Sequence, residues 1–424
     1  MYTASPGSAG DKPLRFLKFP PEIRNKVYAN LLCSFGEQEE QPKDEEEHEV
    51  VIETDQVGNL AHTAILLANR QIHHEAKDVM LRQNQFVRIF IRDIRAPKYP
   101  GRIIVHSAFP AQDPIVRNFK GAVMSYYVKD KYGTQTEHCC RCHGMACDLI
   151  VLAKDLDGFL RAFAGPDNHL PSLPTSTENC IILHDPFKIS TNPNYDLVKY
   201  QRSLLQPFQN HFSGFTKVEI KGKVGKELAK AVMKDIMNEV LPVPDMFLEE
   251  VTNLKNKGNN FFREGRSLDA LRMWRWGIFK LLRLRYSNMW SRIGGQLGVE
   301  FLDSLAQLYF TLHSNAAQHC LQHMHKLHED SEIILTDLSI VECSAHYAMM
   351  AGEVFGSTWQ PSARQEAKVV FRYAQAARLA GELALAHSLI GTALDLQPND
   401  HSIVREAAEI RRRWLQMNVD VQSG

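Results

Sequence analysis

The chain has 424 residues, 44% of them hydrophobic, so it is long enough for two or three domains with full apolar cores. Its 49 lysines and arginines balance its 49 aspartates and glutamates, which excludes a global field that would steer it toward nucleic acid or an anionic membrane. No run reaches the roughly 18 apolar residues of a membrane span, and residues 1–12 lack the apolar core of a signal peptide, so we expect a cytoplasmic or nuclear protein.

The first predicted element is a helix that follows a small, polar tail at residues 1–12, which we expect to be disordered. Pro20-Pro21 fixes the backbone where the helix begins, and Glu22 is a favourable residue at the positive, N-terminal end of a helix dipole. An apolar stripe then recurs at helical spacing and consists of Ile23, Val27 and Leu31. We expect this stripe to be buried in a local core by three later apolar side chains, Ile65, Leu66 and Ile72.

Residues 14–32 contain a Pro-Pro-Glu-Ile-Arg run followed by a tyrosine and paired leucines, and residues 66–76 contain the run Arg-Gln-Ile ahead of an expected strand at 84–91. In these motifs the chain resembles the F-box-like domains that are abundant in filamentous fungi. The resemblance implies an F-box-like domain at residues 13–95, whose helices join the adaptor of a cullin-based ubiquitin ligase. An acidic insert at residues 37–49 departs from that pattern, and its like charges predict a solvated loop.

Residues 96–241 are interpreted as an α/β region of unknown type. Three segments have the β-branched content or the alternation of strands, namely residues 101–106, 180–184 and 216–221. Two segments have helical periodicity, namely residues 148–163 and 226–240. Proline and asparagine punctuate two further stretches, which predicts surface loops at residues 165–179 and 185–194.

A cluster of soft metal ligands lies inside this region. Its members are Cys139, Cys142, His143 and Cys147. Four such ligands suit a tetrahedral structural zinc ion, which would be the one cofactor of the chain. The ligands are so close in sequence that a single knuckle must wrap the ion unless Cys180 or His184 completes the set. The alternative is a loop with free thiols.

Residues 254–274 have the pattern of one helical hairpin. Gly258 and Ala270 are small where two helices approach each other, while Phe261 and Trp274 are bulky and lock the pair. A second copy of this pattern keeps the same offsets near the C-terminus, at Ala374, Ala377, Gly381, Ala386, Ile390, Ala393 and Pro398. Both copies resemble tetratricopeptide repeats, whose period is about 34 residues. The resemblance implies stacked hairpins with a concave groove for an extended peptide.

We expect this repeat domain to span residues 246–424. Its hairpins are predicted at about residues 251–284, 301–349 and 364–398. A capping helix is predicted at residues 399–418, with an apolar side formed by Ile403, Ala407, Ile410 and Trp414. The second helix of the middle hairpin, near residues 341–348, arrives about ten residues late, which an insertion at the hairpin tip would explain. The predicted fold class is α+β, an F-box-like helical and α/β region followed by an all-α tetratricopeptide superhelix.

The resemblance extends to a set of five polar side chains. Tetratricopeptide domains that hold the Glu-Glu-Val-Asp tail of cytosolic heat-shock chaperones use a dicarboxylate clamp of cations and amides. The matching positions in this chain are Lys255, Asn259, Asn315, Lys368 and Arg372. Lys255 and Asn259 are four residues apart, and so are Lys368 and Arg372. Each pair therefore lies on one face of its helix. The alternative is that these side chains are only solvated surface groups.

Two functions follow from these resemblances. The first is a non-enzymatic, co-chaperone-like adaptor that binds heat-shock chaperones of the 70 and 90 kDa classes. The second is an F-box-like substrate receptor of a cullin-based ubiquitin ligase, in which the repeat domain recruits clients. No motif at residues 95–240 supplies an acid, a base and a nucleophile together, so an enzyme is the least favoured class.

Overall fold

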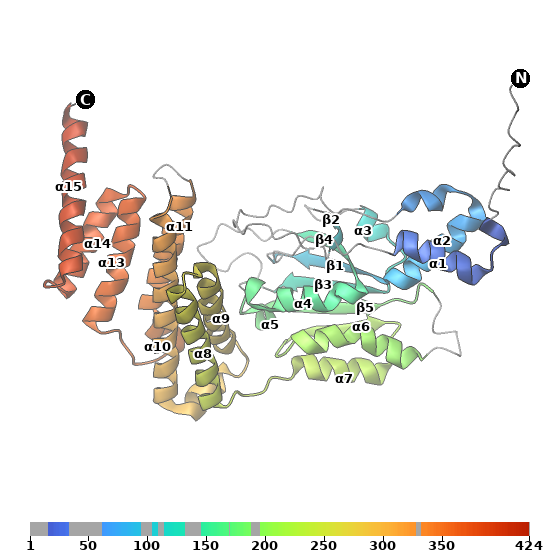
Figure 1. Ribbon diagram of the computed structural model, residues 1–424. Coiled ribbons are helices and arrows are strands. Elements are labelled where there is room, and N and C mark those ends of the chain that lie inside the picture. Colours follow the sequence, from blue (N-terminus) through green and yellow to red (C-terminus); the bar gives the residue numbers. More distant parts are fainter. Residues whose placement is uncertain are drawn as a thin grey trace, which may run out of the picture.

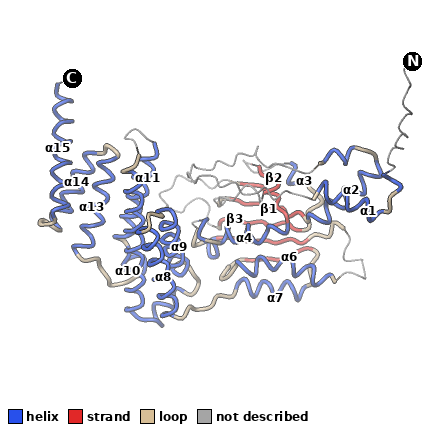
Figure 2. The backbone as a smooth tube through the Cα atoms, in the orientation of Figure 1, coloured by secondary structure: helices blue, strands red, loops and turns tan. Residues whose placement is uncertain are grey.

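The computed structural model describes residues 16–33, 62–94, 104–108, 114–131, 146–168, 170–187, 196–327 and 332–423. Three parts follow one another along the chain: a small helical unit, a mixed β-sheet with covering helices, and a stack of long helices (Figure 1). The strands are confined to the middle part, as Figure 2 shows. The predicted α+β class is therefore confirmed. No helix in the described ranges is long and apolar enough to cross a membrane.

The N-terminal unit packs two helices and two short 3₁₀ turns around a small core. Its elements are η1 (Phe16–Lys18), α1 (Pro21–Leu32), η3 (Thr63–Leu67) and α2 (Arg70–Asn84). The buried apolar side chains are Tyr28, Leu32, Ile72, Ala76 and Val79. Asn69 caps α2, because its side-chain oxygen accepts a hydrogen bond from the backbone N–H of Ile72 at 2.9 Å.

The predicted inward stripe of α1 is wrong for Ile23 and Val27, whereas Leu31 packs against the small core with Ile65 and Leu66, as predicted. Ile23 is 44% exposed and Val27 is 36% exposed. The helix is rotated because Arg24 donates to both carboxylate oxygens of Glu75, at 2.7 and 2.8 Å, and the Tyr28 hydroxyl donates to the same group. This charge-assisted contact holds the face of Arg24 and Tyr28 inward, which leaves the face of Ile23 and Val27 in solvent.

The middle part is built on a six-stranded mixed sheet with the order β2-β4-β1-β3-β5-β6. The strands are β1 (Phe86–Arg92), β2 (Ile104–Ala108), β3 (Met124–Asp130), β4 (Cys147–Leu152), β5 (Thr177–Leu183) and β6 (Val218–Gly222). β1 is parallel to β3 and β5 is parallel to β6, while the other three neighbouring pairs are antiparallel. One face of β1 is wholly apolar, with Val87 and Ile89 in the core, whereas its other face alternates Phe86 and Phe90 with Arg88 and Arg92.

Three helices, α4 (Leu156–Ala164), α6 (Leu197–His211) and α7 (Lys226–Met237), cover one face of the sheet (Figure 1). They bury the largest core of the protein against alternate residues of the strands, such as Val87, Ile89, Tyr126 and Ile181. The short α3 (Pro114–Asn118) packs on the opposite face against Phe86, Ile150 and Leu152. The connections contain η4 (Ala153–Asp155), η5 (Pro166–Asn168) and α5 (Leu173–Ser176).

The helix predicted at residues 148–163 is wrong in its first part, because residues 147–152 form β4 and α4 starts at Leu156. Every side chain of β4 is buried and five of its six residues are apolar, so the strand lacks the alternation that marks a half-exposed strand. The loop predicted at residues 165–179 is shorter, since β5 starts at Thr177. The loop at residues 185–194 lies mostly outside the described residues.

The C-terminal part consists of antiparallel helix pairs. Its helices are α8 (Pro244–Arg263), α9 (Ser267–Arg285), α10 (Trp290–Met324), α11 (Glu332–Met349), α12 (Ala351–Phe355), α13 (Ala363–Leu379), α14 (Leu383–Leu396) and α15 (His401–Ser423). α8 and α9 approach closely at Gly258, where an added Cβ would lie 2.4 Å from the indole Nε1 of Trp274. The glycine is therefore required by packing, and the bulky tryptophan fills the space beside it.

The middle pair differs from the predicted insertion at a hairpin tip. α10 continues to Met324 and α11 already begins at Glu332, so much of the extra sequence lengthens these two helices. α15 covers the last pair as predicted for a capping helix, because Ile403 and Ile410 are buried and the Trp414 ring stacks on His387 with centroids 5.8 Å apart.

Candidate peptide-binding site

The five predicted clamp residues come from three neighbouring helices. Lys255 and Asn259 lie on α8, Asn315 lies on α10, and Lys368 and Arg372 lie on α13. α10 contacts both α8 and α13, so it is the element that joins the two pairs. We call these five residues the polar seam.

The two asparagines of the polar seam are in direct contact. Asn315 Nδ2 donates to Asn259 Oδ1 at 3.0 Å, and Trp274 Nε1 donates to the same oxygen at 3.2 Å. The Asn259 amide is thereby fixed with its oxygen toward the protein, since both donors approach that atom. Its nitrogen makes no hydrogen bond to the described part of the chain and remains a donor for a ligand.

Ser314, which precedes Asn315 in the chain, is the hydrogen-bond partner of Arg372. One terminal nitrogen of Arg372 donates to the Ser314 hydroxyl at 2.7 Å and to the Ser314 carbonyl oxygen. Arg372 is only 6% exposed, and burial lowers its pKa to about 10. Half-buried Lys255 lies one turn before Asn259. The structure therefore joins three of the five residues, Asn259, Asn315 and Arg372, through Ser314–Asn315. Lys255 and Lys368 each lie one helical turn from Asn259 and Arg372, respectively.

Arg372 depresses the pKa of Lys368 through its positive charge, and partial burial and Arg364 lower it further. These three side chains are spaced by four residues, so they share one face of α13. Like charges at this spacing cost roughly 0.2–0.5 kcal/mol per pair in a helix. The sequence motif omitted Arg364 and Ser314, although the helical spacing from Lys368 already pointed to Arg364.

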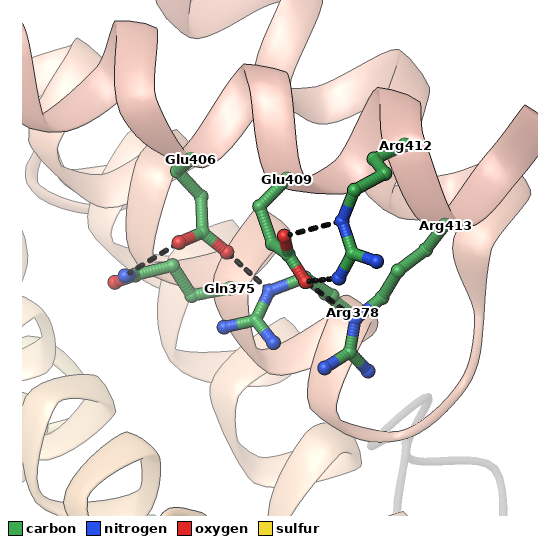
Figure 3. Close-up of polar contacts among 6 residues, drawn as sticks. All are labelled: Gln375, Arg378, Glu406, Glu409, Arg412 and Arg413. Carbon is green, nitrogen blue, oxygen red and sulfur yellow. Dashed lines mark hydrogen bonds and ion pairs between the residues drawn. The ribbon is translucent and has the colours of Figure 1, made fainter.

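Within the described ranges, no carboxylate forms an ion pair with Lys255, Lys368 or Arg372. The other end of α13 differs, as Figure 3 shows. Arg378 and Gln375 both contact the carboxylate of Glu406 on α15, and the Arg378 and Glu406 side chains are only 10% and 12% exposed. Buried charges are normally neutralised in this way, so the cations of the polar seam stand out as unneutralised.

The network in Figure 3 continues along α15 and is structural. Glu409 accepts hydrogen bonds from Arg412 and Arg413, each at 2.8 Å, and these bonds lower the pKa of the Glu409 carboxyl to about 2. The arginines of this cluster are thus satisfied inside the protein. The cations of the polar seam, in contrast, have no carboxylate partner among the described residues and can offer charge-assisted hydrogen bonds to an external anion.

The arrangement suits a ligand with closely spaced carboxylates. Lys255 and Lys368 supply charge, Asn259 supplies an amide donor, and Arg372 retains donors beyond the nitrogen that Ser314 engages.

Three of the four predicted zinc ligands, Cys139, Cys142 and His143, lie outside the described residues. Cys147 is the first residue of β4, fully buried, and burial raises the pKa of its thiol to about 12. His184, named as a possible fifth ligand, has its Nε2 engaged with the Ser125 hydroxyl at 2.8 Å. No group of three or more metal-ligating side chains occurs among the residues that the structure describes.

No protein-family model matches this sequence, and no curated protein matches it significantly. A function for the chain therefore has to come from the chemistry of its own residues.

Proposed function

We propose that the protein is a non-enzymatic, co-chaperone-like adaptor whose C-terminal helices act as a tetratricopeptide domain. The polar seam binds the Glu-Glu-Val-Asp tail of cytosolic heat-shock chaperones of the 70 and 90 kDa classes, which locates the complex in the cytoplasm. The terminal carboxylate and the aspartate side chain of such a tail place two negative charges on the unneutralised cations of α8 and α13.

The observation that carries this proposal is the contrast between two arginines of one helix. Arg378 is neutralised by Glu406, whereas Arg372 is equally well buried and, among the described residues, bonds only to Ser314. A buried charge without a counter-charge destabilises the fold, and a bound carboxylate would supply the negative charge that Arg372 lacks. The hydrogen bonds through Asn259 and Asn315 also hold the seam in place before the ligand arrives, which lowers the entropic cost of binding.

The proposal is tested by the anisotropy of a fluorescent peptide that ends in Glu-Glu-Val-Asp. Lys368 is exposed and anchors no neighbour, so Lys368→Ala should keep the fold and weaken binding by about 1.5–3 kcal/mol, or roughly ten- to a hundredfold. Lys255→Ala should act in the same direction. Lys257→Ala is the matched control, because Lys257 is exposed and two residues away, on the other side of α8.

The result that contradicts the proposal is an equal effect of Lys255→Ala and Lys257→Ala, or no effect of either. Binding should also weaken with added salt, because counterions screen contacts at a groove surface.

A second function is favoured by a different observation. We propose as the alternative that α1 belongs to an F-box-like domain and docks on the adaptor of a cullin-based ubiquitin ligase. Besides Ile23 and Val27, the neighbouring residues Leu17 and Phe19, just before α1, are also exposed, at 43% and 36%. A row of large apolar side chains in solvent is the usual mark of a protein interface.

Affinity capture with the full-length protein separates the two functions. If α1 is the docking face, Ile23→Ser with Val27→Ser should remove the cullin adaptor and leave chaperone capture unchanged. Lys368→Ala should do the reverse. Capture of the adaptor by the α1 variant at the wild-type level would rule out α1 as the docking face.

A further inference from the structure

A pocket of about 310 Å³ lies at the edge of the sheet, far along the chain from the polar seam. It is lined by Arg88, Phe119, Lys120, Ala122, His184, Asp185 and Pro186. Arg88 alternates along β1 with Val87 and Ile89, which belong to the core under α4, α6 and α7. Since side chains alternate across a strand, Arg88 faces the opposite side of the sheet, where α3 packs.

Ser125 on β3 positions two of the lining residues. Its hydroxyl oxygen accepts hydrogen bonds from Arg88 Nε at 3.0 Å and from Arg88 Nη2 at 2.8 Å, and it lies 2.8 Å from His184 Nε2. With both arginine donors on its oxygen, the hydroxyl donates its proton to His184, so Nε2 is the acceptor and Nδ1 carries the ring proton. Ser125 is completely buried and is a support for the pocket, not a group that contacts a ligand.

Arg88 has no counter-charge among the described residues. Beyond Ser125, its guanidinium donates to the carbonyl oxygen of Arg117 at 3.0 Å and contacts His184 Nε2 at 3.4 Å, and no ion pair joins it to a carboxylate of these residues. Arg92, on the same strand and the same face, is instead paired with Asp148 at 2.5 Å. On this face of the sheet Arg92 is therefore neutralised by a carboxylate, whereas the guanidinium of Arg88 can still bind an anion in the pocket.

The lining as a whole is cationic. Arg88 and Lys120 are positive and Asp185 is negative, while the burial of His184 and the charge of Arg88 lower the histidine pKa and favour its neutral form. Phe119, Ala122 and Pro186 give the pocket an apolar wall beside these groups. A ligand that fits must therefore combine an anionic group with a small apolar body.

We propose that this pocket binds a small organic anion, a carboxylate or phosphate monoester with a short apolar or aromatic body. The anion accepts hydrogen bonds from the guanidinium of Arg88 and lies near the ammonium group of Lys120. Ser125 acts as a positioning residue, because it fixes the guanidinium and the imidazole at the same time. This site is separate from the polar seam and does not depend on the peptide-binding function.

The probes are phenyl phosphate and benzoate, with uncharged benzyl alcohol as the reference, titrated calorimetrically into the full-length protein. At least one anion should bind saturably and benzyl alcohol should not, and the ratio of the two anion affinities distinguishes a phosphate site from a carboxylate site. Arg88→Met should weaken the anion at least tenfold. The matched control is Arg161→Met on α4, an exposed arginine on the covered side of the sheet, which should leave the affinity unchanged.

Circular dichroism decides whether Arg88→Met is folded. If it is not, Arg88→Lys and Ser125→Ala take its place, since the first keeps the charge without the planar fork and the second keeps Arg88 without its support. Each should bind the anion several-fold more weakly than the wild type. The proposal is overturned if neither anion binds saturably, if folded variants at Arg88 and Ser125 retain the wild-type affinity, or if Arg161→Met weakens binding equally.

Discussion

At the scale of single residues, the charged side chains divide into two groups. Arg24 has a carboxylate partner in Glu75, and the hydrogen bond between them raises the pKa of the arginine and lowers that of the glutamate to about 2. Within the part of the chain that the structure describes, Arg372 bonds only to neutral groups, and its burial lowers its pKa. A depressed pKa in a basic group means that the fold disfavours its charged form, which a bound anion would reverse.

A buried histidine gives the first prediction. His313 on α10 packs against Tyr309 and Tyr347, neither ring nitrogen has a hydrogen-bond partner, and burial lowers its pKa to about 3. The unfolded chain binds the proton more tightly, so stability from the neutral ring is complete above pH 6.5 and is lost as the pH falls toward 3. We expect a loss of about 2 kcal/mol by pH 5, measured by urea unfolding.

The variant His313→Phe isolates this contribution. It removes the unpartnered nitrogens, so its stability should depend less on pH between 6.5 and 5 than that of the wild type. The remaining slope includes His319, whose pKa burial lowers to about 4. Identical pH profiles for the variant and the wild type would mean that His313 is not held neutral by the fold.

At the scale of elements, the α8–α9 hairpin depends on a glycine. Gly258→Ala should destabilise the protein by about 1–3 kcal/mol, because the new methyl group meets the indole of Trp274 and forces the helices apart. Gly391→Ala on α14 is the matched control, since no atom lies within 4 Å of its added Cβ. That change should stabilise by roughly 0.5–1 kcal/mol. A shift of both urea midpoints in the same direction would contradict this account.

The rotation of α1 gives a second prediction at this scale. Leu32 is completely buried, so Leu32→Ala should cost about 2–5 kcal/mol, whereas Ile23→Ser should stay within about 0.5 kcal/mol because Ile23 is largely exposed. Thermal unfolding of the N-terminal unit within the full chain measures both. If Ile23→Ser lowered the stability more than Leu32→Ala, the side chains of Ile23 and Val27 would have to be buried, which would contradict the account.

Periodicity predicted the long helices because they repeat small and bulky residues at fixed offsets, as at Gly258 and Trp274. It failed for α1, since the contact that rotates this helix joins Arg24 to a residue 51 positions later. The sequence pattern wrongly predicts a helix at β4, because both faces of this strand are buried and its residues show no alternation. Local patterns therefore specify an element better than they specify which side of it is buried.

The same limit applies to the polar seam. The spacing of four residues placed Lys368 and Arg372 on one face, but nothing in that spacing reveals that Ser314 engages Arg372 and buries it. The contact between Asn259 and Asn315 joins residues 56 positions apart and depends on how α8 packs against α10. Arg88 and its pocket carried no sequence motif, because β1, β3 and the end of β5 meet only in the folded sheet.

At the scale of the whole molecule, α9 ties the helical stack to the sheet part. Near its end, Arg283 donates to the carbonyl oxygen of Ser213 at 3.1 Å and lies over the ring of Phe215. Asn288 donates to Gly214 and to the carboxylate of Glu239. Arg283 is partly buried, and this desolvation lowers its pKa to about 10, so the junction is a packed contact and not a loose linker.

We expect Arg283→Met with Asn288→Ala to loosen this junction without unfolding either part. Small-angle X-ray scattering should show a larger radius of gyration, and limited proteolysis should cut faster at residues 238–243, between α7 and α8. Peptide affinity should stay at the wild-type level, because the polar seam lies wholly within the stack. An unchanged cleavage rate would show that other contacts hold the two parts together.

The central claim is that the cations of the polar seam on α8 and α13 bind the terminal carboxylate of a peptide. It is tested most directly by calorimetry of the full-length protein with a peptide that ends in Glu-Glu-Val-Asp, beside the same peptide with a C-terminal amide. The amide lacks one negative charge, so we predict that it binds at least tenfold more weakly and with a shallower dependence on salt. Equal affinities for the two peptides would contradict the account, because the seam would then not recognise the carboxylate that its cations are arranged to hold.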